Sequence, residues 1–209
     1  KHTIMDFYSS RYVFRKHAQL GQSLPPKKQM ALLERFDRRV ALAADELIFL
    51  NQGDAQYFLR EIGLLEENLP YRIIPLATPG RLRALLKGFR QAGEAYHLCW
   101  WGKAAKVHGI EVMLDGIKLL KARQVKFHLT LLEINPERAA FLARKLVEKG
   151  LDDVAEVRFD LSFASGLEGF LVENCDIALG SFGLSEYTKV GLSNKNVDAL
   201  SMGIPMVTT

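Results

Sequence analysis

The segment YHLCWWGKAAKVHGIEVMLDGIKLL, residues 96–120, contains the transition that decides the fold. An apolar run typical of a buried strand ends at Gly102, and the next few residues include Lys103 and His108. The apolar residues of 110–120 recur three or four positions apart, which predicts an amphipathic helix. A strand, a short cationic loop and a helix in this order indicate one βαβ unit of a parallel sheet.

The same alternation continues on both sides of this segment and predicts an α/β fold, with a mostly parallel sheet covered by helices on both faces. Asp54 is the expected N-cap of one helix, and Asn135 and Gly150 are the expected ends of another. The expected strands are 46–51, 71–77, 96–101, 125–134, 154–159, 175–180 and 204–209. The expected helices are 32–45, 54–65, 79–93, 108–122, 136–149, 166–174 and 194–203.

Composition excludes several classes of protein. Of the 209 residues, 48% are hydrophobic and 25% are charged, which is ordinary for a globular chain. The sequence contains no run of 18 apolar residues, so it predicts no helix that spans a membrane. Cys99 and Cys175 lie in apolar runs, so we expect buried, reduced thiols in a cytoplasmic protein and no metal site.

Charge is unevenly distributed along the chain. Residues 1–40 hold nine Lys and Arg against three Asp and Glu, within a net charge of +4. Such a basic segment fits an anionic membrane or substrate, or it is simply a solvated face. Aromatic residues are not interleaved with these charges, so we expect no nucleic-acid partner.

In open α/β sheets ligands bind beyond the carboxyl ends of the strands. This rule selects the loops 102–108, 133–135, 159–161 and 180–194. In the first loop, glycine, lysines and a helix N-terminus favour a phosphate, although a solvated loop has the same composition. In the last loop, Ser193 or Asn194 would cap a helix, with Asp198 one turn further on. A carboxylate there suits a sugar diol, or it is a surface residue of that helix.

Two stretches carry a resemblance to a known family. WGKAAKVHGIEVML and SNKNVDALSMGIPMVTT resemble, in order and spacing, motifs of GT-B glycosyltransferases of family four, also called glycosyltransferases group one. In this alignment Lys103 replaces a family arginine and His108 a family lysine, both of which hold the donor diphosphate. Asp198 replaces the glutamate that binds the donor ribose. Val190 stands where the family often carries a second glutamate beside the sugar ring.

The resemblance implies a GT-B type fold, with a Rossmann-like parallel sheet preceded by part of a second Rossmann-like domain. Residues 1–78 would be the remnant of an N-terminal, acceptor-side domain with its connector. Residues 79–209 would be the C-terminal nucleotide-sugar-binding domain without its final helices. We therefore expect a fragment that is inactive alone.

The resemblance also implies the roles of individual residues, with no cofactor, no metal and no catalytic residue that can be named. Asp198 would bind the ribose, and Phe159 and Leu161 would lie near the base. The residues implied to bind the donor diphosphate are Gly102, Lys103, His108, Ser193, Asn194 and Lys195.

The implied activity is transfer of a sugar from a nucleotide-diphosphate-sugar to a sugar or lipid-linked acceptor, retaining and metal-independent, in glycan, lipopolysaccharide or capsule biosynthesis. A contact of the basic segment with the inner face of the membrane is a further hypothesis. Two alternatives stay open. One is a GT-B nucleotide-sugar epimerase, and the other is a non-catalytic nucleotide-binding module whose site has decayed.

Overall fold

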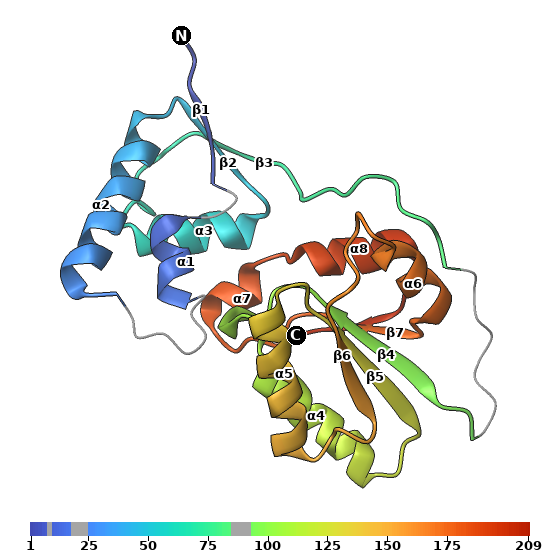
Figure 1. The fold of residues 1–209 in the computed structure, drawn as a ribbon. Coiled ribbons are helices and arrows are strands. Elements are labelled where there is room, and N and C mark those ends of the chain that lie inside the picture. Colours follow the sequence, from blue (N-terminus) through green and yellow to red (C-terminus); the bar gives the residue numbers. More distant parts are fainter. Residues whose placement is uncertain (8–9, 18–24, 85–92) are drawn as a thin grey trace. The chain divides into compact units, whose positions relative to one another are not determined.

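The computed structural model describes residues 1–7, 10–17, 25–84 and 93–209 (Figure 1). The chain forms two compact units. The first comprises Lys1–Ala77 and Leu184–Leu192, and the second comprises Thr78–Gly183 and Ser193–Thr209. Both units are therefore discontinuous in sequence, because the short segment Leu184–Leu192 belongs to the first unit. The acceptor-side and donor-side roles expected of 1–78 and 79–209 stay predictions.

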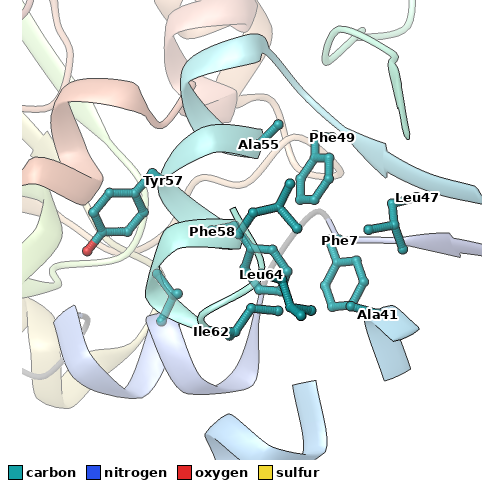
Figure 2. Packing of buried hydrophobic residues seen from close by; sticks show 11 residues of the cluster. Phe7, Ala41, Leu47, Phe49, Ala55, Tyr57, Phe58, Ile62 and Leu64 are labelled. Carbon is teal, nitrogen blue, oxygen red and sulfur yellow. The ribbon is translucent and has the colours of Figure 1, made fainter. Parts of the chain in front are cut away.

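The first unit is a small parallel sheet with helices around it, as expected for part of a Rossmann-like domain. Its strands pair in the order β1-β2-β3, and both pairings are parallel. Figure 2 shows the core, in which Phe7, Phe49 and Phe58 gather between the sheet and the helices. The strands are β1 (Ile4–Asp6), β2 (Glu46–Phe49) and β3 (Tyr71–Ile73). The helices are α1 (Arg11–His17), α2 (Lys27–Ala43), α3 (Gln52–Glu61) and α7 (Glu186–Val190).

The N-cap of helix α3 lies three residues before the expected one. The Asn51 side chain accepts a hydrogen bond from the Asp54 amide at 2.9 Å, so Asn51 caps the helix and the prediction of Asp54 was wrong. Asn51 also donates through Nδ2 to the carbonyl oxygen of Val190 at 2.9 Å. One side chain thus caps α3 and binds the end of α7, a helix that the sequence did not predict.

The second unit is a five-stranded parallel sheet of Rossmann type. Its strands lie in the order β6-β5-β4-β7-β8. The order runs outward in both directions from β4, so the topological switch point lies between β4 and β7, where such sheets bind ligands. The strands are β4 (Tyr96–Trp101), β5 (Phe127–Leu132), β6 (Ala155–Arg158), β7 (Ile177–Leu179) and β8 (Met206–Val207).

Helices cover both faces of this sheet, as predicted. Helices α4 and α5 lie on one face, and α6 and α8 lie on the other (Figure 1). Cys99 and Trp101 of β4 pack with Leu171 of α6 and Met202 of α8. Cys99 and Cys175 are both buried and not in a disulfide, as expected. The helices are α4 (Ile110–Ala122), α5 (Pro136–Lys149), α6 (Leu167–Asn174) and α8 (Asn194–Met202), with a 3₁₀ turn, η1, at Lys106–His108.

The predicted helix over 79–93 is wrong in its first part. Residues 78–84 have no regular secondary structure, and the Ala84 amide donates to the carbonyl oxygen of Met202 at 2.8 Å. Residues 85–92 lie outside the described residues. By contrast, α5 has the expected ends: Asn135 caps it through its side chain, and Gly150 adopts the left-handed conformation at its C-terminus.

Candidate donor site at the switch point

Two loops meet at the carboxyl ends of β4 and β7. Gly102 follows β4 directly and has a φ of +116°, a conformation that favours glycine. A Cβ on Gly102 would lie 3.7 Å from Cε of Lys195, the second residue of α8. The fold therefore brings together two predicted site residues that are 93 positions apart in the sequence.

Lys195 is the central feature of this site. Its side chain is buried, with 5% of the residue exposed, and its Nζ has no hydrogen-bond partner in the described part of the chain. The Nζ lies 4.1 Å from the centre of the Trp100 ring. Burial lowers the pKa of Lys195 to about 7, although the negative charge of Glu133 acts in the opposite direction. An amine held in this way is short of a counter-ion.

Glu133, the first residue after β5, does not fill that role. Burial alone would raise the pKa of its carboxyl group, but hydrogen bonds from Arg138, Ala104 and Asn135 lower it overall. Arg138 donates to Oε2 at 2.8 Å and to Oε1 at 3.0 Å, and the Ala104 amide donates to Oε2 at 2.7 Å. The Glu133 carboxylate thus orders the loop after Gly102 and forms its ion pair with Arg138, not with Lys195.

His108 lies at the end of η1 and pairs with the loop after β7. Its Nδ1 is 3.0 Å from Oγ of Ser181, and its carbonyl oxygen accepts from the Phe182 amide at 3.0 Å. Burial, together with the charges of Lys195 and Lys103, lowers the pKa of His108 to about 3. The imidazole is therefore neutral at physiological pH. It can donate a hydrogen bond to an anion but cannot supply the positive charge that the replaced family lysine would carry.

Three further residues were predicted to bind the diphosphate, namely Lys103, Ser193 and Asn194. Lys103 is exposed, and Ser193 is the N-cap of α8. The Ser193 hydroxyl donates to Oδ1 of Asn196 at 2.9 Å and accepts no bond from a helix amide. Asn194, exposed, is the first residue of the helix. Lys195 thus lies in the first turn of α8, and the amides of this turn have no side-chain cap.

Asp198 is not an exposed residue on the surface of its helix, which was the alternative to a role in binding. It is buried, with 5% exposed, and its Oδ1 accepts from Arg81 Nη2 at 2.8 Å, Arg81 Nε at 3.1 Å and Thr78 Oγ1 at 3.0 Å. The Arg81 guanidinium also lies 4.0 Å from the centre of the Phe163 ring. The segment 78–84, which was expected to begin a helix, therefore delivers an arginine to the carboxylate.

Several solved structures are similar to this chain in fold. The structure of WaaG, a glycosyltransferase involved in lipopolysaccharide biosynthesis, superposes with a TM-score of 0.63 at 14% identity, over 99% of this chain and 56% of that one. The pneumococcal O-GlcNAc transferase GtfA, in complex with UDP and GlcNAc, gives 0.57 at 11% identity, over 83% and 32% of the two chains. The chain has the GT-B glycosyltransferase fold.

The likeness is one of fold, and it extends beyond transferases. The N-terminal domain of trehalose-6-phosphate phosphatase from Candida albicans superposes with a TM-score of 0.56 at 12% identity, over 98% of this chain and 55% of that one. The present GT-B chain thus spans about a third to just over half of the length of these proteins. No family profile and no curated protein sequence matches it.

In the GT-B chain, the residues predicted to lie near the base are less closely tied to the switch point. Phe159 is 63% exposed, whereas Leu161 packs against the cluster that contains Trp101 and Met202. Val190, the position of the absent second glutamate, belongs to α7 in the first unit. In the described ranges, no three His, Cys, Asp or Glu side chains are placed to hold a metal ion, and no helix is long and apolar enough to cross a membrane.

Several residues of this candidate site were missed by reasoning from the sequence. Trp100 has the pattern of an apolar strand residue, but its ring forms a cation–π contact with the Lys195 amine. Thr78 and Arg81 lie 120 and 117 positions from Asp198, so no local pattern connects them. Ser181 could have been suspected, because it lies in a loop that the strand-end rule selected.

Proposed function

We propose that this chain is the donor-binding part of a glycosyltransferase, in which the second unit binds a nucleotide-diphosphate-sugar at the switch point of its sheet. The observation that carries the proposal is the buried amine of Lys195, a residue in the first turn of α8. This amine has no hydrogen-bond partner in the described residues and lies beside Gly102. A diphosphate supplies the missing negative charge, and glycine permits its close approach.

Each predicted residue has a role in this proposal. Lys195 and Lys103 provide positive charge, and the neutral His108 donates a hydrogen bond to a phosphate oxygen. The amides at the start of α8, next to Ser193 and Asn194, donate to the same group. Asp198 accepts from the ribose hydroxyls. Phe159 and Leu161 lie toward the base.

The proposed reaction is sugar transfer of the family-four type, retaining and independent of metal. The bond between the anomeric carbon and the diphosphate oxygen breaks, the oxygen of the acceptor hydroxyl bonds to that carbon, and the hydroxyl proton passes to the departing diphosphate. The lysines and helix amides stabilise the negative charge that develops on the departing diphosphate. The acceptor is a sugar or a lipid-linked sugar, as in glycan, lipopolysaccharide or capsule biosynthesis.

Ligand binding tests the donor part of this proposal directly. We expect pyrophosphate and one of UDP, GDP, ADP or CDP to raise the melting temperature of the chain. At a hundredfold excess over its dissociation constant a ligand adds about 2.7 kcal/mol, or roughly 5–10 °C for a chain of this size. Lys195→Met and Lys103→Ala should abolish or reduce both shifts. Absence of any shift with all five ligands would contradict the proposal.

A second candidate is a nucleotide-binding module without transferase activity. Val190 in place of a glutamate and the neutral state of His108 favour it, since both remove groups that the family uses on the donor. The transferase, the module and the epimerase alternative differ in turnover by the full-length protein. Release of nucleoside diphosphate that depends on an acceptor supports the transferase, and donor turnover without any acceptor supports an epimerase. Binding without turnover supports the module.

We also propose that α2 contacts an anionic membrane surface. Leu32, Arg35, Phe36 and Arg39 are all exposed and follow the helical spacing, so they form one mixed apolar and basic stripe. Arg38, another arginine of the basic segment 1–40, instead donates to the carbonyl oxygens of Ile62 and Gly63. Arg35→Glu with Arg39→Glu should reduce co-sedimentation with phosphatidylserine vesicles, and unchanged binding would refute the contact.

A further inference from the structure

The Asp198 carboxylate is oriented by a segment that lies far from it in the sequence. All three of its hydrogen bonds, from Thr78 and from two nitrogens of Arg81, go to the same oxygen, Oδ1. Oδ2 accepts no hydrogen bond from any residue in the described ranges. The carboxylate is therefore fixed through one oxygen, while the other keeps its capacity to accept.

The arginine is itself held in place on several sides. Its guanidinium stacks on the Phe163 ring at 4.0 Å, and its Nε donates to the Thr78 hydroxyl at 3.1 Å. The segment is anchored after Arg81, because the Leu82 amide donates to Oε1 of Glu168 in α6 at 2.7 Å. With side-chain exposures of 16% for Arg81 and 7% for Asp198, this pair is largely removed from water. Such a pair is ordered, unlike a surface salt bridge.

We propose that Arg81 is a positioning residue for nucleoside recognition: it locks Oδ1 of Asp198 so that Oδ2 is presented to the ribose diol of the donor. This inference rests on the proposed function and adds to it a residue outside both family motifs. A carboxylate fixed before binding accepts from a hydroxyl without first being ordered, and preorganisation of this kind increases both affinity and selectivity.

The readout is discrimination between ribose and 2′-deoxyribose, which a merely structural contact would not change. The probes are the nucleoside diphosphate that binds, its 2′-deoxy counterpart, and pyrophosphate, measured by titration calorimetry. In the wild-type chain we expect the ribonucleotide to bind about 10- to 100-fold more tightly than the deoxynucleotide, the range expected for hydrogen bonds to a charged group. Pyrophosphate lacks a ribose and reports on the diphosphate residues alone.

We expect Arg81→Ala to bring that ratio close to one while leaving pyrophosphate affinity within about twofold of the wild-type value. Arg81→Lys keeps the charge but loses the planar fork, and should recover part of the discrimination. Asp198→Asn should behave like Arg81→Ala, and the double variant should add no further loss. Arg83→Ala is the matched control, because Arg83 is an exposed arginine two positions away on the same segment.

Three results would overturn the inference. An Arg81→Ala variant that melts earlier but keeps the ratio would make the pair a structural latch. A variant that binds the ribonucleotide more tightly would make Arg81 a block on the ribose position. Wild-type binding of pyrophosphate with no preference for ribose would remove the inference and leave the diphosphate site intact. If neither pyrophosphate nor any nucleotide binds, the proposed function fails as well.

Discussion

At the scale of single residues, the site depends on groups that folding holds in an unfavourable state. Lys195 is the clearest case, because the unfolded chain would carry its amine as a solvated cation with a pKa near 10.5, whereas the folded pKa is about 7. A difference of this size corresponds to roughly 5 kcal/mol at and below pH 7. Retaining such a residue is understandable if its partner is a ligand, since binding then relieves the penalty.

We predict that Lys195→Met stabilises the chain while abolishing pyrophosphate binding. Methionine fills a similar volume without a charge, so the unfolding free energy at pH 7 should rise by a few kcal/mol. Between about pH 7 and 10.5 the unfolded state holds a proton that the folded state has released, so this lysine makes stability rise with pH. Urea unfolding of both chains from pH 6 to 9 should show that extra slope in the wild type alone.

The matched control for this experiment is Lys103→Met, which removes an exposed lysine of the same site. It should leave the pH slope in place. Parallel slopes in wild type and Lys195→Met would mean that the folded chain keeps Lys195 protonated and contradict the prediction.

A second prediction at this scale concerns the glycine between η1 and α4. A Cβ at Gly109 would lie 2.2 Å from the backbone carbon and oxygen of Phe182, and φ is +61°. Gly109→Ala should therefore cost about 2–4 kcal/mol, since the two loops of the site are pushed apart. Gly116 lies inside α4 with nothing within 4 Å of its would-be Cβ, so Gly116→Ala should stabilise by about 0.5–1 kcal/mol. Thermal unfolding of the two variants checks both signs.

At the scale of elements, periodicity and capping residues explain which predictions were confirmed. The helix after Asn135 and the buried face of α4, with Ile110, Met113, Leu114 and Ile117, match the sequence pattern because local preference and burial agree there. The segment 79–84 has helix-forming residues after a proline, but hydrogen bonds to α6 and α8 hold it in another conformation. Tertiary contacts thus override the local preference of this segment for a helix, and these contacts could not be predicted from the local sequence.

Helix α7 is an element that reasoning from the sequence did not find. It has only five residues, and its contacts are with α3 and α1: Tyr187 stacks on His17 with ring centres 5.6 Å apart, and Val190 packs beside Gly53. We predict that Val190→Asp destabilises the first unit and speeds amide hydrogen exchange in α3, while exchange in α5 is unchanged. Lys189→Ala, at an exposed position of the same helix, should alter neither rate, and equal acceleration in α3 and α5 would contradict this assignment.

At the scale of the whole molecule, the fold class was predictable and much of the site was not. Alternating strands and helices specify a parallel sheet, and the strand-end rule then selects the loop that holds Gly102 and His108 and the loop that ends just before Lys195. The strand order, which places these loops beside one another, cannot be read from the spacing of the elements. The pairing of Asp198 with Arg81, and the loss of charge on His108, follow from burial and from contacts across more than 70 positions.

The return of α7 to the first unit has a consequence for synthesis on the ribosome. The hydrogen bond from Asn51 to Val190 cannot form until Val190 has been synthesised, 139 residues later. At about 5–20 residues per second this interval is roughly 7–28 s, during which the nascent α3 lacks its partner helix. A chain whose synthesis stops before Glu186 would thus lack α7 and expose the α3 surface that α7 covers.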